Sequence, residues 1–327
     1  MQKIAPLAFI AILVLLVFAS WKGPETPPIN TTPTLTDRPV QTGTLSISGA
    51  FALYPLTVKW ADEFKKTHPG IRIDISAGGA GKGITDVLSG VTDIGLVSRD
   101  LTPEEDKKGA FPIAVTKDAV IPTISSSNPF LKELQVKGIK KEALNRIFIT
   151  GELRSWGQLG LKSNAPVHVY TRSDAAGAAE TWAGYFGKKQ EDLQGVAVYG
   201  DPGLALAVKK DPSGIGFNNI VYVYDAQSKQ PTNGVVPLPI DLNNNGKIDA
   251  DENVYATIDD ITRAIAAGKF PSPPARDLYF VTRGGVKNPV AKAFISWVLT
   301  EGQKYVKEAG YINLSQEKIN AGLGKLK

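Results

Sequence analysis

Three segments of small residues stand where a predicted strand ends and a predicted helix begins, and such segments can bind anions. The segments are Ser48–Pro55, Ala77–Gly83 and Arg172–Ala179. The first turn of a helix presents unpaired backbone N–H groups and the positive end of the helix dipole, and residues without bulky side chains let an anion approach them. Arg99 and Arg172 follow predicted strands and add positive charge, although either one alone is also explained by a surface ion pair. Together these features predict an anion pocket.

The glycine-rich segment Ala77–Gly83 does not match the nucleotide-binding P-loop. That motif needs a glycine five residues before the Gly81-Lys82 pair and a Ser or Thr directly after it. The chain has Ser76 and Gly83 at these two positions. The motif therefore fails at both ends, and the segment is not predicted to bind a nucleotide.

Residues 241–252 match the twelve-residue calcium loop of EF-hands. In that loop oxygen ligands stand at positions 1, 3, 5, 7, 9 and 12, and a glycine at position 6 makes the turn. Because calcium takes six to eight oxygens, this spacing predicts a structural calcium ion (Ca2+), and the alternative is an Asn- and Asp-rich turn without a metal. Pro237 and Pro239 leave no helix directly before the loop. The predicted ligands are Asp241, Asn243, Asn245, Lys247 through its carbonyl, Asp249 and Glu252.

The composition excludes several other kinds of site. The 327 residues include no cysteine and only two histidines, which rules out disulfides, cysteine nucleophiles and His-rich catalytic metal sites. The chain has 37 Lys and Arg against 32 Asp and Glu, and the net charge of +5 is too small a surplus to indicate nucleic-acid binding. There is no Gly-x-Ser-x-Gly motif, and neither His68 nor His168 is placed to serve a serine nucleophile. We therefore predict that the chain is not an enzyme and does not bind nucleic acid.

The N-terminal residues predict export. Ile4–Ala19 is apolar throughout apart from Pro6, and as a helix it would span about 24 Å, slightly less than a bilayer core. Residues 1–22 are therefore either a cleaved signal peptide or a retained membrane anchor, which would give the chain its membrane contact. Residues 23–43 are rich in Pro and Thr and predict an extended linker. The folded part is expected to be extracytoplasmic, either periplasmic or at the cell surface.

Strands and helices alternate from residue 44 onward, which predicts an α/β fold with mostly parallel sheets. A chain of 327 residues exceeds the length of about 250–300 residues beyond which one hydrophobic core stops growing, so two lobes are expected. Two long β-rich runs, Ile113–Ser125 and Asp277–Arg283, are predicted to cross between them. Lobe I then comprises 44–124 plus 277–327, and lobe II comprises 125–276 with the calcium loop 241–252. Ligands of such proteins bind between the lobes, at the carboxyl ends of strands.

The chain resembles the phosphate-binding proteins of ABC importers, which have the type II periplasmic-binding-protein fold. The resemblance runs from about residue 44 to residue 311, nearly the whole folded part. It implies a two-lobed monomeric receptor that closes on an inorganic oxyanion and delivers it to an ABC permease in the membrane. The motifs that carry it are Ser48-Gly49, Tyr54-Pro55-Leu56 with Trp60, Gly78–Ile84, Asp93–Arg99, Ile147–Gly151 with Trp156, and Arg172-Ser173-Asp174.

The chain also departs from this family where the anion would bind. Family members place Ser or Thr hydroxyls at positions that are Ala52, Ala80, Ala176 and Ala178 here, and a proton-accepting Asp where this chain has Arg99. A pocket without a carboxylate acceptor should tolerate sulfate, molybdate or tungstate, so phosphate is preferred through the resemblance alone. The predicted anion-binding residues are Ala52, Leu53, Ala80, Gly81, Ser98, Arg99, Arg172, Ala176, Gly177 and Ala178.

Two readings from other classes remain open at this point. An extracellular phosphatase could use the calcium ion, although the loop reserves no ligand position for a substrate. A sensor or surface-interaction protein could keep the fold and have lost transport. Turnover of a phosphate ester would favour the phosphatase. The absence of a permease partner would favour the sensor or surface-interaction protein.

Overall fold

The computed structural model describes residues 42–327. The predicted signal peptide or membrane anchor and nearly all of the Pro/Thr-rich linker lie outside the described residues. Within residues 42–327, no helix has both the length and the apolar character needed to span a bilayer.

One sheet of nine strands organises the described chain. Its strand order is β2-β1-β3-β11-β4-β8-β6-β7, and β9 also pairs with β4. β1 is parallel to β2 and β3, and β6 is parallel to β7 and β8, whereas β4 and β11 are antiparallel to their neighbours. The bounds are β1 Gly43–Gly49, β2 Ile71–Ala77, β3 Ile94–Val97, β4 Ala110–Ser125, β6 His168–Arg172, β7 Val196–Val198, β8 Gly214–Asn219, β9 Val235–Pro237 and β11 Ala275–Arg283.

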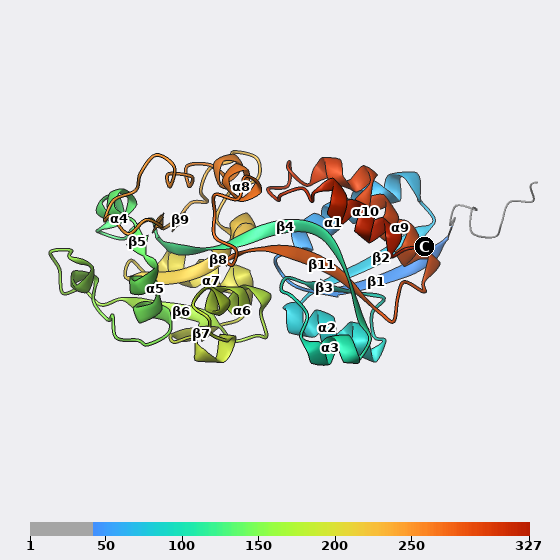
Figure 1. Ribbon diagram of the computed structural model, residues 1–327, viewed down its shortest axis with the longest axis horizontal. Coiled ribbons are helices and arrows are strands. Elements are labelled where there is room, and N and C mark those ends of the chain that lie inside the picture. The colour runs from blue at the N-terminus through green and yellow to red at the C-terminus, as the bar shows by residue number, and fades with distance from the viewer. Residues whose placement is uncertain (1–41) are drawn as a thin grey trace, which may run out of the picture. The chain divides into compact units, whose positions relative to one another are not determined.

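β4 and β11 are the two long strands that connect the halves of the molecule. From Ala110 to Ala119, β4 pairs with β11, and from Val120 to Ile124 it pairs with β8. In Figure 1 both strands run from one group of elements to the other. This confirms the predicted α/β architecture of the type II periplasmic-binding-protein fold, in which two segments cross between the lobes.

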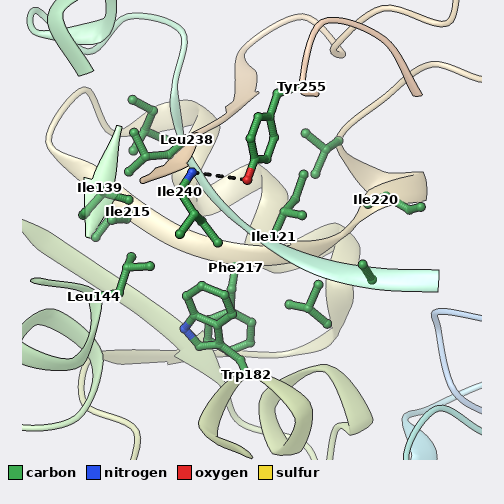
Figure 2. Packing of buried hydrophobic residues seen from close by; sticks show 14 of the residues in the cluster. Ile121, Ile139, Leu144, Trp182, Ile215, Phe217, Ile220, Leu238, Ile240 and Tyr255 are labelled. Carbon is green, nitrogen blue, oxygen red and sulfur yellow. Dashed lines mark hydrogen bonds between the residues drawn. The ribbon is translucent and has the colours of Figure 1, made fainter. Parts of the chain in front are cut away.

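Two hydrophobic cores lie on either side of this crossing. One is built from residues 45–115 and 278–326, and we call the elements around it lobe I. The other is built from residues 119–275 together with Ile312, and we call its elements lobe II. Figure 2 shows the lobe II core, in which Trp182 stacks on Phe217 at a centroid distance of 5.8 Å. One core gives way to the other in the middle of β4 and β11, so both strands contribute buried residues to both cores.

The helices cover the sheet and follow from apolar residues at helical spacing. In lobe I, α1 begins with Pro55 in its first turn and buries Leu56, Trp60 and Phe64 on one face. It ends at His68, whose backbone leaves the helical region and whose ring stacks on Phe64. The helices of lobe I are α1 Tyr54–Thr67, α2 Ala80–Ser89, α3 Pro103–Lys107, α9 Pro289–Leu299 and α10 Gln316–Gly324. Those of lobe II are α4 Leu131–Lys137, α5 Lys141–Phe148, α6 Gly177–Tyr185, α7 Gly200–Lys210 and α8 Ile258–Ala266.

One segment differs from its predicted structure. The spacing of apolar residues in 302–309 predicts an α-helix, but the structure forms only a 3-10 helix at Glu301–Tyr305. Gly302 lies under Trp60, whose indole N–H donates to the Gly302 carbonyl at 2.8 Å. The helix prediction was therefore wrong, because a tertiary hydrogen bond takes up a carbonyl that an α-helix would use.

Candidate functional site

The loops at the starts of α2 and α6 meet between the lobes. The amide N–H of Gly81 donates to the carbonyl of Ala175 at 3.0 Å. A methyl group added at Gly79 would lie 2.7 Å from Asp174 Oδ2, and one at Gly177 would lie 2.3 Å from Ser98 Oγ. The lobes thus approach so closely here that only glycine fits. Three of the predicted anion-binding residues, Gly81, Ser98 and Gly177, come together at this junction.

The turn before α1 contacts lobe II on the other side of this junction. The Phe51 ring lies over the Arg172 guanidinium at 5.5 Å and meets Tyr199 edge-on at 5.8 Å. The hydroxyl of Tyr222 donates to the Phe51 carbonyl at 2.9 Å, and burial raises the Tyr222 pKa, which keeps this group a donor. All three predicted segments therefore lie at the contact between the lobes.

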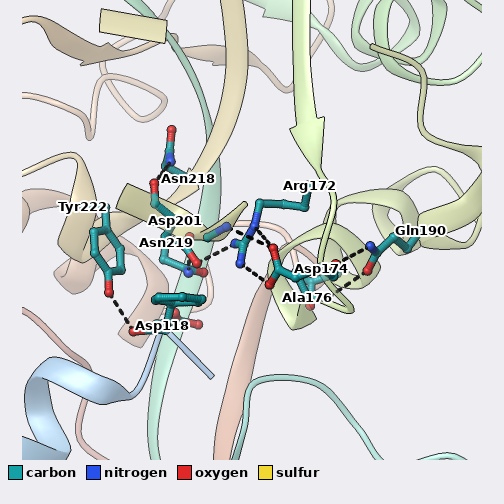
Figure 3. A network of polar contacts seen from close by, with 12 residues as sticks. Asp118, Arg172, Asp174, Ala176, Gln190, Asp201, Asn218, Asn219 and Tyr222 are labelled. Carbon is teal, nitrogen blue, oxygen red and sulfur yellow. Dashed lines mark hydrogen bonds and ion pairs between the residues drawn. The ribbon is translucent and has the colours of Figure 1, made fainter. Parts of the chain in front are cut away.

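Arg172 is buried and held by two carboxylates, as Figure 3 shows. Its Nε and Nη2 donate to the two oxygens of Asp174 at 2.9 and 2.6 Å, and its Nη1 donates to Asp201 Oδ2 at 2.5 Å. Burial opposes the charge of Arg172, but the attraction of Asp201 and Asp174 outweighs it and raises the Arg172 pKa. Among residues 42–327 these contacts use three of the five guanidinium N–H groups. The other two have no hydrogen-bond partner among the described residues.

Arg99 has a different environment. Its Nη1 and Nη2 donate to the two oxygens of Glu105 at 2.8 and 2.7 Å. Glu105 also accepts from the Thr102 amide at 2.8 Å, which makes it part of the N-terminal cap of α3. Burial opposes ionisation of Glu105, but the Arg99 and Thr102 hydrogen bonds outweigh it and lower the Glu105 pKa. Arg99 is therefore fixed within its own loop, without a contact to Arg172.

The alanines of the predicted site are all buried. Ala52, Ala80, Ala176 and Ala178 are exposed by 3 % or less, so methyl groups occupy the positions of the missing hydroxyls.

The backbone N–H groups of the predicted site differ in whether they already donate a hydrogen bond within the protein. Leu53 donates to the Ala50 carbonyl at 3.2 Å, and Gly81 donates across the lobes. Neither is free for an anion in this structure. In residues 42–327 no hydrogen bond is found from the amides of Gly177 and Ala178, at the N-terminus of α6. These two amides are the predicted backbone donors that have no hydrogen-bond partner in the described chain.

A buried polar network behind Arg172 was not predicted from the sequence. Asn219 donates to Asp201 Oδ1 at 2.6 Å and accepts from Arg276, which pairs with Asp118 at 2.9 Å. Burial raises the Asp118 pKa even though the Arg276 charge opposes this. The network therefore ties the Arg172 cluster to both crossing strands. The available signal was a pair of charged residues within each long β run, Lys117-Asp118 in one and Arg276-Asp277 at the start of the other.

Comparison with known proteins identifies the family. A family model described as the PBP superfamily domain matches residues 36–301. The chain belongs to the PBP superfamily. The predicted resemblance to phosphate-binding proteins within this superfamily is also confirmed by curated relatives and solved structures.

Two curated relatives and one structure of this superfamily illustrate the likeness. The chain is 27 % identical to the phosphate-binding protein PstS of Bacillus subtilis, over 85 % of this chain and 83 % of that protein. It is 28 % identical to PstS of Pseudomonas aeruginosa PAO1, over 83 % of each. A putative phosphate ABC transporter substrate-binding protein from Clostridium perfringens, solved with bound phosphate, has a TM-score of 0.68 and 25 % identity, and covers 84 % of this chain and 100 % of its own.

The predicted calcium loop forms a compact turn on lobe II of this PBP-superfamily chain. The first ligand position, Asp241, ends β10 (Ile240–Asp241), which is parallel to β5 (Ile139–Lys140). The amide of Ile248 donates to the Val136 carbonyl at 2.8 Å, and the Ile248 side chain packs over Gly138. The loop is therefore attached to lobe II at its start and at its middle.

The first and last ligand positions of the loop are buried carboxylates. Asp241 and Glu252 are 1 % and 4 % exposed. Asp241 accepts from the Gly246 amide at 2.8 Å, and Glu252 accepts from the amides of Leu242 and Asn243 at 2.8 and 3.0 Å. Neither carboxylate forms an ion pair with another of the described residues. Across residues 42–327, the structure has no group of three or more His, Cys, Asp or Glu side chains placed to hold a metal.

Proposed function

We propose that this chain is the solute-binding protein of an ABC importer and captures inorganic phosphate between its two lobes. The observation that carries the proposal is the junction at the start of α6. There two backbone amides and two N–H groups of a buried arginine lack partners among the described residues, and loops of both lobes meet. Relatives and a solved structure that share this fold are named as phosphate-binding proteins.

The site binds by enclosure. The dipole of α6 and the amides of Gly177 and Ala178 attract an anion at the helix start. Asp174 and Asp201 hold the Arg172 guanidinium in place, so its remaining N–H groups need no reorganisation when a ligand arrives. Contact between the lobes excludes water from these groups, which strengthens each charged hydrogen bond.

The site offers few ways to recognise a proton on the ligand. Asp174 is one of two carboxylates that contact Arg172, but both of its oxygens accept from Arg172, and Oδ1 also accepts from the Gly200 amide at 3.0 Å. It orients the guanidinium and has little capacity left to accept from hydrogen phosphate. Fully deprotonated oxyanions such as sulfate, molybdate or tungstate are therefore the alternative ligands.

Calorimetric titration of the full-length chain with phosphate, sulfate, molybdate and tungstate tests this proposal. We expect phosphate to bind, and the order of the four affinities then gives the selectivity. Binding of sulfate, molybdate or tungstate in preference to phosphate would change the proposed ligand but would leave the proposed receptor function unchanged. If none of the four anions gives a heat of binding, the proposed function is wrong.

We infer that the protein binds its ligand without converting it. The relatives that match most of its length are named as binding proteins. Incubation with a chromogenic phosphate ester, with and without calcium, should give no product above the buffer blank. Turnover that a Glu252→Gln variant abolishes would instead support the calcium-dependent phosphatase.

The setting we propose is extracytoplasmic, with an ABC permease as partner and a monomeric receptor. The apolar segment Ile4–Ala19 supports export, either as a signal peptide or as an anchor. Sequencing the N-terminus of the mature protein from its native membrane distinguishes the two. A mature chain that begins after residue 22 would exclude the anchor, and retention in the cytoplasm would contradict export.

We also propose that residues 241–252 bind a structural calcium ion. Support comes from the EF-hand spacing and from two buried carboxylates, Asp241 and Glu252, that have no cationic partner in the described chain. Buried charges in proteins are usually paired or bound to metals. Glu252 would supply the bidentate ligand, and Lys247 would contribute its carbonyl oxygen.

Thermal unfolding before and after removal of calcium tests this site. At a calcium concentration a hundredfold above the dissociation constant, binding should stabilise the protein by about 2.7 kcal/mol. Glu252→Gln should lose this stabilisation, and Glu317→Gln, on the exposed start of α10, should keep it. A wild-type melting temperature that does not respond to calcium up to about 1 mM, within the range for extracellular modules, would contradict the site.

A further inference from the structure

Arg276 is a buried cation at the point where the crossing strands pass from one core to the other. It lies directly opposite Asp118 in the pairing of β11 with β4. Its neighbour Ala275 belongs to the lobe II core, whereas Leu278 belongs to the lobe I core. Arg276 is 8 % exposed and Asp118 is fully buried, so protein groups rather than water surround this charge.

The guanidinium of Arg276 joins its own strand to three other elements. It donates to Asp118 on β4 through Nε at 2.9 Å, to Thr181 on α6 through Nη1 at 2.9 Å, and to the Asn219 side chain on β8 through Nη2. Nη2 also donates to the second Asp118 oxygen at 3.4 Å. Four of the five N–H groups are used in this way, so Arg276 holds protein groups and offers little to a ligand.

One chain of hydrogen bonds leads from Arg276 to Arg172. Asn219 accepts from Arg276 through Oδ1, so its Nδ2 is the atom that faces Asp201, and it donates to Asp201 Oδ1 at 2.6 Å. The other oxygen of Asp201 accepts from Arg172 Nη1 at 2.5 Å (Figure 3). Arg276 therefore sets the orientation of Asn219 and, through it, holds the carboxylate that orients Arg172.

The second contact leads to the start of α6. Thr181 lies one helical turn after Gly177, and its buried hydroxyl oxygen accepts from Arg276. The amides of Gly177 and Ala178, which have no partner among residues 42–327, are in the first turn of the same helix. Because an α-helix is a rigid element, the contact at Thr181 also fixes where these amides point.

Neutralisation of charge does not by itself account for these contacts. Asp118 already balances the charge of Arg276, and a buried ion pair often adds little to stability compared with apolar residues of similar size. The contacts to Asn219 and Thr181 are additional. Both lead to groups of the proposed anion site.

We propose that Arg276 is a positioning residue of the anion site. It fixes Arg172 and the start of α6 relative to each other, so that donors from a strand and from a helix are in place before the anion arrives. Arg276 itself does not touch the anion. The inference rests on the proposed function, because it needs the anion to bind at the start of α6.

Titration of the full-length chain and its Thr181→Val variant with inorganic phosphate tests the contact to α6. Valine keeps the shape of threonine and removes the oxygen that accepts from Arg276. We expect phosphate affinity to fall at least about fivefold, whereas Thr181→Ser, which keeps the oxygen, should bind within about twofold of the wild type. Unchanged affinity in Thr181→Val, or an equal loss in Thr181→Ser, would overturn the inference.

The matched control is Thr262→Val, on α8 of the same lobe. Thr262 is 6 % exposed, and its hydroxyl donates to the Ile258 carbonyl at 2.8 Å, outside the Arg276 contacts. The variant should lower the free energy of unfolding, measured by urea denaturation, and leave phosphate affinity within about twofold. A loss of affinity equal to that of Thr181→Val would show a general effect of destabilisation and would also overturn the inference.

Removal of Arg276 together with Asp118 tests the residue itself. The double variant Asp118→Asn, Arg276→Gln leaves no lone charge from this pair in the core, so it should fold. We expect phosphate affinity to fall at least about tenfold, and the further change Thr181→Val to weaken it by no more than about twofold, because Thr181 then has no arginine to hold. Additive losses would show that Thr181 acts without Arg276.

The outcomes separate this inference from the proposed function. Phosphate binding by the wild type, with unchanged affinity in the Thr181→Val chain and in the double variant, would overturn only the role of Arg276. No phosphate binding by the wild type would overturn the proposed function and this inference with it.

Discussion

The two arginines predicted to bind the anion, Arg172 and Arg99, are held in different ways. The Arg172 side chain is 1 % exposed and pairs with Asp174 and Asp201. The Arg99 side chain is 17 % exposed and pairs with Glu105, six residues further along the chain. One arginine is thus part of the buried structure of lobe II, and the other belongs to a local loop of lobe I.

This difference indicates that binding and stability are linked at Arg172 and separable at Arg99. Two carboxylates buried next to Arg172 would be left without a cation if it were removed, whereas Glu105 is near the surface and keeps its backbone partner. Substitutions at the two positions should therefore have different kinds of effect, and their comparison can be tested directly.

Arg172→Ala should have the largest effect. Breaking a buried ion pair by removing one partner should lower the free energy of unfolding by about 3–5 kcal/mol, measured by urea denaturation. Phosphate affinity should fall at least about tenfold. The double variant Arg172→Ala, Asp201→Asn should recover part of the stability but none of the binding. Full affinity in the single variant would contradict the proposed site.

Restoring a hydroxyl at the start of α6 should have the next largest effect. Ala178→Ser places a donor where the chain has a buried methyl group, and a hydrogen bond to a charged ligand contributes about 1.5–3 kcal/mol. Calorimetry should show phosphate affinity rising by about tenfold or more. Ala266→Ser, on the exposed face of α8, is the control and should change nothing. No gain at Ala178 would mean that this position does not face the anion.

Arg99→Ala should have a smaller effect. Its ion pair is near the surface, so the free energy of unfolding should fall by about 1 kcal/mol or less. Phosphate affinity should fall less than in Arg172→Ala. Arg263→Ala, which removes a more exposed pair, serves as the baseline. A larger loss of affinity than for Arg172→Ala would reverse the roles of the two arginines.

The smallest effect should be seen in the pH dependence of the Arg99 pair. The Glu105 pKa is lower in the folded protein than its ordinary value of 4.5, so its contribution to stability is present above that pH. The contribution is lost as the pH falls through the lower, folded value. Urea unfolding from neutral pH to below 4.5 should show a shallower decline for Glu105→Gln than for the wild type. Identical profiles would show that the pair adds nothing to stability.

Much of the fold followed from local patterns. The helical spacing of Leu56, Trp60 and Phe64 predicts α1, and the alternation of Ile71, Ile73 and Ile75 predicts β2, because each pattern matches the period of one element. The short elements β5 and β10 could not be predicted in this way. Each has two residues, too few to show a period, and they form only because they pair with each other.

The sequence by itself determined where the anion loops begin and that their hydroxyls are missing, because both depend on residues within one strand–turn–helix unit. It also determined the oxygen-bearing positions of the proposed calcium loop, because residues 241–252 are continuous in the chain. Only the tertiary structure decided the distant partners of Arg172 and Arg276. Arg172 and Asp201 are 29 residues apart, and Arg276 and Asp118 are 158 apart. No local pattern reports such pairs, since the charged groups meet only when the sheet brings their strands and helices together.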